Sequence, residues 1–268
     1  MTNDKAFSNG VPRGDVVLIG GARFRVDGVI RQGANSRILS AHSMEGGGDS
    51  AFVIKYTPCR RDDERWDACL REIHAGRLLR RCRGILPLLG YAVRTDGAGN
   101  CGVFLLFERA ECLEGARLSE REVTAMARSV IAALRCMSRK GLAHGDVKPA
   151  NLYRMDGRWL LGDLGSVTEA GQPARFVSEG YCAPEALRGG PCGFRADLYS
   201  LGISCYRLLS GTLPFCPLPC AEMTEDEVHE AIGRRLSGEP IPPVPGVSDS
   251  VNRAILRMCE FSPHKRRV

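Results

Sequence analysis

Long hydrophobic runs are absent from this chain of 268 residues. A membrane-spanning helix needs about 20 mostly apolar residues, and no stretch of the sequence comes close to that. The first ten residues, MTNDKAFSNG, lack the apolar core of a signal peptide. We therefore expect a cytoplasmic protein without a membrane segment in this chain, although a longer parent protein could be membrane-anchored.

Lysine is scarce, since the 37 basic residues comprise 5 Lys and 32 Arg. Each of the five lysines is therefore a candidate for a specific role. The net charge of +6 is mild and the basic residues are scattered. Nucleic acid is not an expected partner, because no block of Lys and Arg is interleaved with aromatic residues. A composition of 44% hydrophobic and 25% charged residues excludes disorder, collagen and coiled coil as descriptions of the whole chain.

Twelve cysteines are present, but none of them forms a C-x-x-C motif. Several, such as Cys136 and Cys205, fall in helix-like or apolar runs. Without an export signal, we expect reduced thiols that pack as small apolar side chains. Cys216 and Cys220 form a close pair, but no second pair or histidine cluster completes the four ligands of a structural metal site.

The first part of the chain predicts a small β-rich lobe. Residues 1–21 are polar and are expected to form a flexible leader, and residues 22–107 are expected to form the lobe. Within it, Trp66, Leu70 and Ile73 recur at helical spacing and predict one helix. Short apolar runs between Gly and Asp turns predict strands at 24–26, 37–39, 52–54 and 102–107.

The second part predicts a larger and mainly helical lobe over residues 113–268, joined to the first by a hinge at 108–112. Ser119 and Glu122 form a capping box at the start of a periodic helix that Gly141 terminates. A strand pair is expected between Leu152 and Leu161, followed by helices near 197–210, 223–236 and 248–261. The fold class that this order predicts is α+β.

Polar residues that could take part in a reaction follow the predicted helix and strands in a definite order. The segment from His144 to Leu152 reads HGDVKPANL, and Asp163-Leu164-Gly165 follows the strand pair. Upstream, Lys55 ends the strand AFVIK, and Glu72 lies seventeen residues later on the predicted helix. Downstream come Ala183-Pro184-Glu185 and the helical segment DLYSLG at 197–202.

These residue types suit phosphoryl transfer. That reaction needs counter-charge for a polyphosphate, a divalent metal, and a group that aligns the attacking oxygen. Asn151 and Asp163 offer hard oxygen ligands that suit Mg²⁺. Lys55 can neutralise phosphate oxygens with Glu72 as its fixed partner. Asp146 and Lys148 place a carboxylate and an ammonium two residues apart in a loop.

Together these motifs resemble the signature set of the eukaryotic-like serine/threonine protein kinases. The resemblance covers residues 22–268 and rests on seven motifs in the right order. It implies a bilobal kinase fold and an ATP-dependent enzyme that phosphorylates Ser or Thr of a protein substrate. The implied cofactors are ATP and Mg²⁺, with Mn²⁺ as an alternative metal.

The resemblance also implies a role for individual residues. Asp146, Lys148, Lys55 and Glu72 match the catalytic set, and Asn151 and Asp163 match the metal ligands. The residues that match the nucleotide site are Gly33, Ile38, Val53, Lys55, the gatekeeper Phe107, Glu108 and Ala110 of the hinge, and Tyr153. Three further residues match substrate-binding and structural positions. Ser178 would bond the catalytic loop, and Asp197 would brace the backbone of that loop. Glu185 would be the partner of a late arginine, which we assign to Arg266.

The sequence departs from the family pattern at three glycine-related places. Only Gly33 remains of the glycine-rich phosphate loop, and Gly145 replaces the arginine that usually precedes the catalytic aspartate. Because that arginine normally pairs with a phosphorylated activation segment, we expect activity that does not require such phosphorylation. Gly76 stands where an apolar side chain usually packs beside Leu164. Either Phe107 fills this gap, or Leu78 or Leu79 does so in a shifted register.

Two other functions stay open at this stage. A pseudokinase or scaffold would explain the eroded glycine loop, but it would be free to lose Asp146 or Asp163. A small-molecule kinase shares the fold, but such enzymes tend to lack the elements at 183–185 and 197–202. The chain ends shortly after Arg266, where the family's last helix normally continues, so we expect one domain of a longer protein.

Overall fold

The computed structural model describes residues 11–45, 51–96 and 99–268, which separate into two compact units. Unit 1 comprises the described residues up to Arg80 together with Leu86–Ala110. Unit 2 comprises Arg81–Ile85 and Glu111–Val268. The first ten residues of the predicted leader lie outside the described residues. Each unit is considered by itself below.

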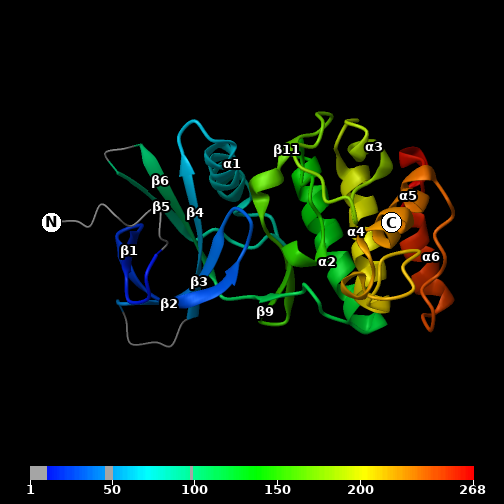
Figure 1. Ribbon diagram of the computed structural model, residues 1–268, viewed down its shortest axis with the longest axis horizontal. Helices are drawn as coiled ribbons and strands as arrows, with labels where there is room; N and C mark the ends of the chain where they lie inside the picture. Colours follow the sequence, from blue (N-terminus) through cyan, green and yellow to red (C-terminus); the bar gives the residue numbers. More distant parts are fainter. Residues whose placement is uncertain (1–10, 46–50, 97–98) are drawn as a thin grey trace. The chain divides into compact units, whose positions relative to one another are not determined.

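Unit 1 is built on a six-stranded antiparallel sheet with the strand order β1-β2-β3-β4-β6-β5 (Figure 1). The four predicted strands lie within β2, β3, β4 and β6. The two edge strands also contact each other, and Arg94 of β5 donates a side-chain hydrogen bond to the Val16 carbonyl of β1. The strands are β1 (Val16–Ile19), β2 (Ala22–Gln32), β3 (Arg37–Ser43), β4 (Ala51–Arg60), β5 (Gly90–Thr95) and β6 (Asn100–Glu108).

Strand β1 corrects the prediction that residues 1–21 are a flexible leader throughout. Val17 and Ile19 are buried in the unit 1 core, and β1 pairs with β2 along its whole length. Four residues flanked by polar and glycine-containing segments give too short an alternation to stand out in the sequence. The close fit is visible at Gly90 of β5, where an added Cβ would lie 2.8 Å from the Ile19 side chain.

Helix α1 (Glu64–Leu79) begins at Asp63, whose side chain accepts a hydrogen bond from the Arg65 amide. The helix is present as predicted. Ile73 is buried against β6 residues of a small core cluster, and Trp66 packs against the same cluster. The prediction is wrong at Leu70, which is 43% exposed, whereas the neighbouring Cys69 is buried.

Unit 2 is formed mainly by helices α2 (Glu120–Ser138), α4 (Phe194–Ser210), α5 (Glu225–Ser237) and α6 (Asp249–Met258), with the short α3 (Pro184–Leu187). The predicted capping box of Ser119 and Glu122 is present at the start of α2. The predicted periodic residues of α2 are almost fully buried: Met126, Val130, Leu134 and Met137. None of the helices in the described ranges is long and apolar enough to span a membrane.

Short strands in unit 2 carry the loops of interest. β9 (Leu152–Met155) and β10 (Arg158–Leu161) form the predicted pair, and Asp156 and Gly157 turn it with positive φ angles of 48° and 73°. Strand β7 (Glu111–Cys112) joins β9, and β8 (Leu142–Ala143) pairs with β11 (Thr168–Glu169). Short 3₁₀ turns lie at Pro149–Asn151, Leu164–Ser166, Cys220–Glu222 and Pro263–Lys265.

One pair of cysteines overturns the expectation that all thiols are reduced. Cys82 and Cys136 of α2 form a disulfide across 54 residues of sequence. Ten other cysteines are not part of a disulfide, and eight of these are buried. The disulfide lies within unit 2, because residues 81–85 belong there rather than to the β-rich lobe that the sequence predicted around them. Spacing could not reveal it, since the fold alone brings the two residues together.

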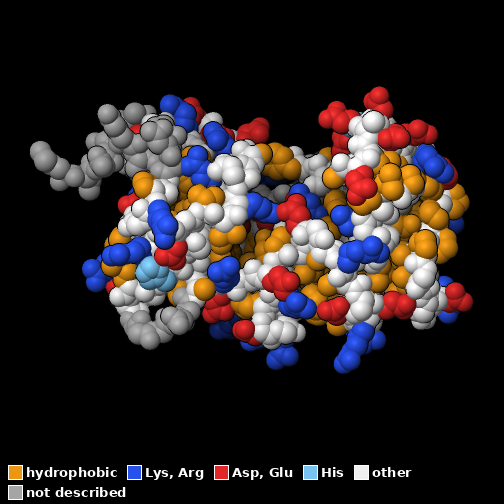
Figure 2. Space-filling view, turned by 60° about the horizontal axis from the view of Figure 1, so that its bottom comes forward, with side chains coloured by type: hydrophobic (Ala, Val, Ile, Leu, Met, Phe, Trp, Pro, Cys, Tyr) orange, Lys and Arg blue, Asp and Glu red, His pale blue; other side chains and the backbone are white. Residues whose placement is uncertain are grey.

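The surface carries charges of both signs. On the face shown in Figure 2, the described Lys and Arg side chains occur in small groups separated by acidic and apolar side chains. The net charge of +6 is therefore distributed rather than gathered into one patch on this face.

Candidate active site

One face of the unit 1 sheet collects four of the eight residues that the sequence assigned to nucleotide binding. Across the sheet, Ile38 pairs with Lys55, and Val53 pairs with Phe107. Residues two apart on a strand and directly opposite on the next strand share a face. All four are partly buried, whereas Ile54 on the opposite face is fully buried in the core. The sheet thus presents a half-covered surface with an ammonium group on it.

Lys55 and Glu72 form the ion pair that the motif predicted. The Lys55 Nζ atom lies 2.8 Å from Glu72 Oε2, with side-chain exposures of 17% and 6%. A glutamate so deeply buried requires a charged or hydrogen-bonded partner. The pair therefore fixes the lysine ammonium at the sheet surface, where β4 and α1 approach each other.

Leu88, which neither sequence-based explanation named, fills the space beside Gly76. A Cβ on Gly76 would lie 3.0 Å from Leu88 Cβ and from Leu88 Cδ2. Phe107 packs against the cluster formed by α1 and β6, and Leu78 is 41% exposed. Leu88, in the segment before β5, thus occupies the space that a side chain at position 76 would fill. Sequence spacing does not predict this contact between Leu88 and α1.

The hairpin between β2 and β3 replaces the glycine-rich loop. The Gly33 amide donates a hydrogen bond to the Ser36 carbonyl at 2.8 Å, which closes a tight turn. A Cβ on Gly33 would lie 3.1 Å from that carbonyl oxygen. Arg37 donates to Gln32 Oε1 at 2.8 Å across the hairpin base. The single retained glycine is therefore the one that the backbone turn needs.

The predicted hinge residues follow the end of β6. Glu108 is the last residue of that strand and pairs with Phe52. The Arg109 amide donates to the Ala51 carbonyl at 3.1 Å, and Ala110 is the last residue of unit 1. Backbone bonding of adenine by this segment stays a prediction.

In unit 2, Asp146 and three other predicted residues form one hydrogen-bonded cluster. Ser178 donates to Asp146 Oδ1 at 2.7 Å, and Lys148 Nζ lies 2.8 Å from Asp146 Oδ2. Lys148 also donates to Ser178 Oγ at 2.8 Å. Asn151 donates through Nδ2 to the Asp146 carbonyl at 2.8 Å and to Oδ2 at 3.1 Å. The Asp146 carboxylate is therefore held in one orientation from three directions.

Asp197 of α4 supports the loop that carries Asp146. Its two carboxylate oxygens accept hydrogen bonds from the backbone amides of His144 at 2.8 Å and Gly145 at 2.9 Å. Burial raises the pKa of Asp197, while His144 and the two amide donors favour its charged form and oppose that shift. Each oxygen is thus used as a backbone anchor. This is the bracing contact that the sequence predicted.

Gly145 itself adopts a backbone conformation that favours glycine. Its φ angle is +81°, and an added Cβ would lie 3.0 Å from the Ser166 carbonyl oxygen. A side chain here would be strained both by its backbone angle and by this contact. The departure from the family pattern is therefore consistent with the local backbone.

Asn151 and Asp163 are brought together by backbone contacts. The amide of Gly162, which precedes Asp163, donates to the Asn151 carbonyl at 2.9 Å, and His144 Nε2 lies 3.0 Å from the Gly162 carbonyl. Asp163 has a φ angle of 56°. A carboxylate and a carboxamide oxygen fit a hard divalent cation whose remaining ligands are phosphate oxygens and water. Among the described residues, no group of three or more His, Cys, Asp or Glu could hold a metal alone.

Comparison with known sequences decides the family. The profile of the family described as "Protein kinase domain" matches residues 24–267. This chain belongs to the protein kinase family. The antiparallel sheet of unit 1 and the helices of unit 2 are the two parts of its α+β fold.

Individual relatives agree with this kinase assignment. The chain is 27% identical to CBL-interacting protein kinase 16 of Oryza sativa subsp. japonica over 266 residues, which is 91% of this chain and 54% of that protein. It is 35% identical to the serine/threonine-protein kinase PknL of Mycobacterium tuberculosis over 139 residues, 46% of this chain and 35% of PknL. The matched regions thus cover about half of the first relative and about a third of the second.

One further predicted contact is present in unit 2 of the kinase domain. Arg266 forms a two-pronged ion pair with Glu185, with Nη2 and Oε2 2.7 Å apart, and its side chain is fully buried. Tyr153 lies on β9 between Leu160 and Cys112. Its contact with adenine remains a prediction.

Arg235 of α5 is a positioning residue that the sequence did not reveal. Its guanidinium is buried and donates to the carbonyls of Glu179 and Cys182 and to the Tyr199 hydroxyl. It thereby holds the segment that follows Ser178. One arginine among 32 gives no sequence signal, and only the packing of α5 distinguishes it.

Proposed function

We propose that this kinase domain is an ATP-dependent serine/threonine protein kinase that uses Mg²⁺, or Mn²⁺ as an alternative. The observation that carries the proposal is the Asp146 carboxylate, held by Ser178, Lys148 and Asn151 at 2.7–3.1 Å. Such fixed orientation is what a phosphoryl-transfer site supplies. The similarity to protein kinases supports a protein hydroxyl as acceptor.

In this mechanism the substrate hydroxyl binds against Asp146, which orients it and accepts its proton as the oxygen attacks the γ-phosphorus. Lys148 neutralises charge on the transferring phosphoryl group, and Lys55 neutralises the other phosphates. The bond to ADP breaks as the new ester bond forms. Asn151 and Asp163 would hold a divalent metal, which supplies further neutralisation of phosphate charge.

The decisive experiment measures transfer of radiolabelled phosphate from ATP to a protein substrate. We expect transfer by the wild type and its loss in Lys55→Met and Asp163→Asn, with all three proteins folded by circular dichroism. A parallel panel of small alcohols tests the small-molecule kinase alternative. Transfer to alcohols but not to protein would overturn the proposed substrate class.

Phosphorylation of the activation segment is proposed to be unnecessary. The segment between Asp163 and Glu185 has four hydroxyl residues, Ser166, Thr168, Ser178 and Tyr181. Of these, Ser178 is bonded to Asp146 and Thr168 is buried in β11. Gly145 offers no cation to pair with a phosphate. Phosphatase treatment that removes all bound phosphate, verified by intact mass, should change the rate by less than about twofold, whereas a large loss would refute this part of the proposal.

A second candidate is nucleotide binding without efficient catalysis. The tight β2–β3 turn, with Gly33 as its one glycine at 33–36, favours it because the backbone there is less adaptable than a glycine-rich loop. A fluorescent ATP analogue that binds with no phosphate transfer to any substrate would support this function. Transfer that Asp163→Asn abolishes would exclude it.

A further inference from the structure

The two ends of the disulfide in unit 2 differ in their exposure. Cys82 is 7% exposed, whereas Cys136 of α2 is partly exposed. Their Cα atoms lie 6.0 Å apart, which is within the usual range for a disulfide. Thiol–disulfide exchange requires an attacking thiolate to reach one of the two sulfurs. Attack from solvent is therefore favoured at Cys136, with Cys82 as the leaving group.

Both cysteines stand in stretches that are rich in arginine and free of acidic residues. The sequence reads RRCRG at 80–84 and LRCMSRK at 134–140. No aspartate or glutamate occurs within residues 73–95 or 123–145. A positive potential around a disulfide stabilises the departing thiolate and attracts an anionic thiolate from solution. The charge around this bond therefore favours exchange with an anionic thiol.

Three exposed arginines adjoin the two cysteines. Arg81 and Arg83 flank Cys82, and Arg135 precedes Cys136. None of the three arginines forms an ion pair with a residue in the part of the chain that the structure describes. Because neighbouring Cα atoms are only about 3.8 Å apart, the distance from each charge to the bond is of the order of one Debye length, about 8–10 Å. Salt therefore screens their attraction for an anion only in part.

The segment that the disulfide holds also contacts the strand before Asp163. The Leu161 amide, at the end of β10, donates to the Gly84 carbonyl at 2.8 Å, and Ile85 forms a parallel bridge with Leu161. Asp163 follows Leu161 by two residues. Because Cys82 is two residues before Gly84, its release from α2 would loosen a contact of this strand close to a predicted metal ligand.

We propose that the Cys82–Cys136 bond is a site of thiol–disulfide exchange with an anionic small thiol of the glutathione class, and that its opening loosens the end of β10 and slows phosphoryl transfer. The exchange goes beyond the proposed kinase function, and only the effect on the transfer rate rests on that function. The carboxylates of glutathione outnumber its ammonium group. It therefore meets the arginines with the opposite charge.

The exchange takes place in two balanced steps. A thiolate attacks the Cys136 sulfur and forms a new S–S bond, while the bond to Cys82 breaks and its electron pair moves to the Cys82 sulfur, which takes a proton from water. A second thiolate then attacks the sulfur of the bound small thiol, and Cys136 leaves as a thiolate. Two small thiols are thereby oxidised to one disulfide, and the protein disulfide is reduced to two thiols.

A purely structural disulfide makes a different prediction. Its reduction would follow the intrinsic reactivity of the attacking thiolate and would not depend on the charge that this thiolate carries. At equal thiolate concentration, glutathione would then react no faster than the neutral 2-mercaptoethanol, because the more basic thiolate of 2-mercaptoethanol is the stronger nucleophile. Selection between the two reagents by charge separates the two roles.

The first measurement follows reduction of the oxidised full chain by glutathione and by 2-mercaptoethanol. Samples are alkylated at timed intervals, and peptide mass spectrometry measures the new thiols at Cys82 and Cys136. At equal thiolate concentration, glutathione should react at least about fivefold faster. In Cys82→Ser, glutathione disulfide should leave one glutathione on Cys136, which traps the intermediate of the first step.

Two triple variants test whether charge causes this excess. Replacement of all three adjoining arginines by glutamine should remove the excess: Arg81→Gln, Arg83→Gln and Arg135→Gln. The matched control removes three exposed arginines at or near α6 and should keep the excess: Arg253→Gln, Arg257→Gln and Arg267→Gln. Circular dichroism verifies that both variants are folded.

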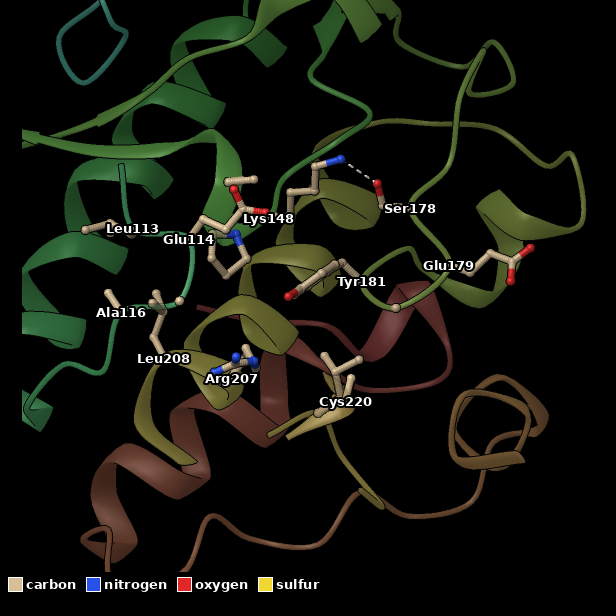
Figure 3. A pocket seen from close by; sticks show the side chains of 15 residues that line it. Leu113, Glu114, Ala116, Lys148, Ser178, Glu179, Tyr181, Arg207, Leu208 and Cys220 are labelled. Atoms are coloured by element: carbon tan, nitrogen blue, oxygen red, sulfur yellow. Dashed lines mark hydrogen bonds between the residues drawn. The ribbon is translucent and has the colours of Figure 1, made fainter. Parts of the chain in front are cut away.

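The second measurement compares the oxidised and the reduced wild type. Reduction should raise the hydrogen-exchange rate of the Leu161 amide at least about fivefold. Phosphate transfer to a protein substrate should fall at least about threefold, and Cys82→Ser should transfer at the reduced rate whether or not glutathione is present. Cys220→Ser is the control and should keep the wild-type response to glutathione, since this partly exposed cysteine lines a separate pocket (Figure 3).

Two results would overturn the exchange site. One is equal reduction of the wild type by glutathione and 2-mercaptoethanol, and the other is an excess that persists in the variant without the three adjoining arginines. An unchanged Leu161 exchange rate or transfer rate after complete reduction would overturn the coupling to β10. If no phosphate is transferred in either state, the kinase proposal fails separately, and the reduction rates with the Leu161 exchange rate still decide this inference.

Discussion

The two units hold their functional side chains in different ways. In unit 1, Glu72 stands on α1, which buries six of its 16 residues and leaves Leu70 and Leu78 more than 40% exposed. In unit 2, Asp197 stands on α4, which buries twelve of its 17 residues. A helix covered on all sides resists displacement more than one that packs by a single face. We infer that changes in unit 2 cost stability as well as activity, whereas changes in unit 1 mainly cost activity.

The largest effect is expected at Asp146. Asp146→Asn should lower kcat by about 10²–10⁴-fold, because the amide cannot accept the substrate proton. Its shape and most hydrogen bonds remain, so the melting temperature should shift little. Asp156→Asn, at an exposed aspartate of the β9–β10 turn, is the control and should keep wild-type activity in a steady-state assay. Substantial turnover by Asp146→Asn would remove this residue from the mechanism.

Asp197→Ala tests whether the contact between Asp197 and the loop of Asp146 supports both stability and activity. It leaves the amides of His144 and Gly145 buried without their acceptor, which should lower the free energy of unfolding by about 2–4 kcal/mol. Activity should fall with it, since the loop of Asp146 loses its anchor. Urea denaturation gives the stability change. Asp197→Asn retains one acceptor oxygen and should lose about half as much, and an equal loss in both variants would contradict the bracing role.

Glu72→Gln tests the contrasting behaviour of unit 1. The neutral amide leaves the Lys55 ammonium less well fixed, and kcat/KM should fall about 10–100-fold. Stability should fall by only about 1–2 kcal/mol, since the glutamine amide can still accept a hydrogen bond from Lys55. Kinetics and urea denaturation are compared with those of Glu64→Gln, an exposed glutamate on the same helix. A loss of stability as large as that of Asp197→Ala would break the comparison.

The smallest effect is expected at Gly76. Gly76→Ala places a Cβ 3.0 Å from Leu88, and the crowding is partly offset by the better helix propensity of alanine. The net loss of stability should be about 1 kcal/mol, with activity within about threefold of wild type. Combining it with Leu88→Ala should give less than the sum of the two single losses, which a double-mutant cycle measures. Additive losses would show that Leu88 does not fill this space.

Much of the site was predictable because the chemistry of a phosphoryl-transfer site restricts the residue types and their order along the chain. Lys55, Glu72, Asp146, Lys148 and Asn151 were assigned by motif, and their predicted neighbours are in contact. The pairing of Glu185 with Arg266, 81 residues apart, was also predicted because both positions fit the resemblance. Helix α2 was predictable from its apolar periodicity, and its capping box from Ser119 and Glu122, because both signals are local.

Sequence alone thus determined the fold class, the family resemblance and the candidate residues, because local periodicity and spaced motifs are encoded within short segments. Tertiary structure alone decided which distant side chains share one space. It placed Leu88 beside Gly76 and joined Cys82 to Cys136. These contacts depend on close packing between elements far apart in the chain, and spacing along the polymer does not specify such packing.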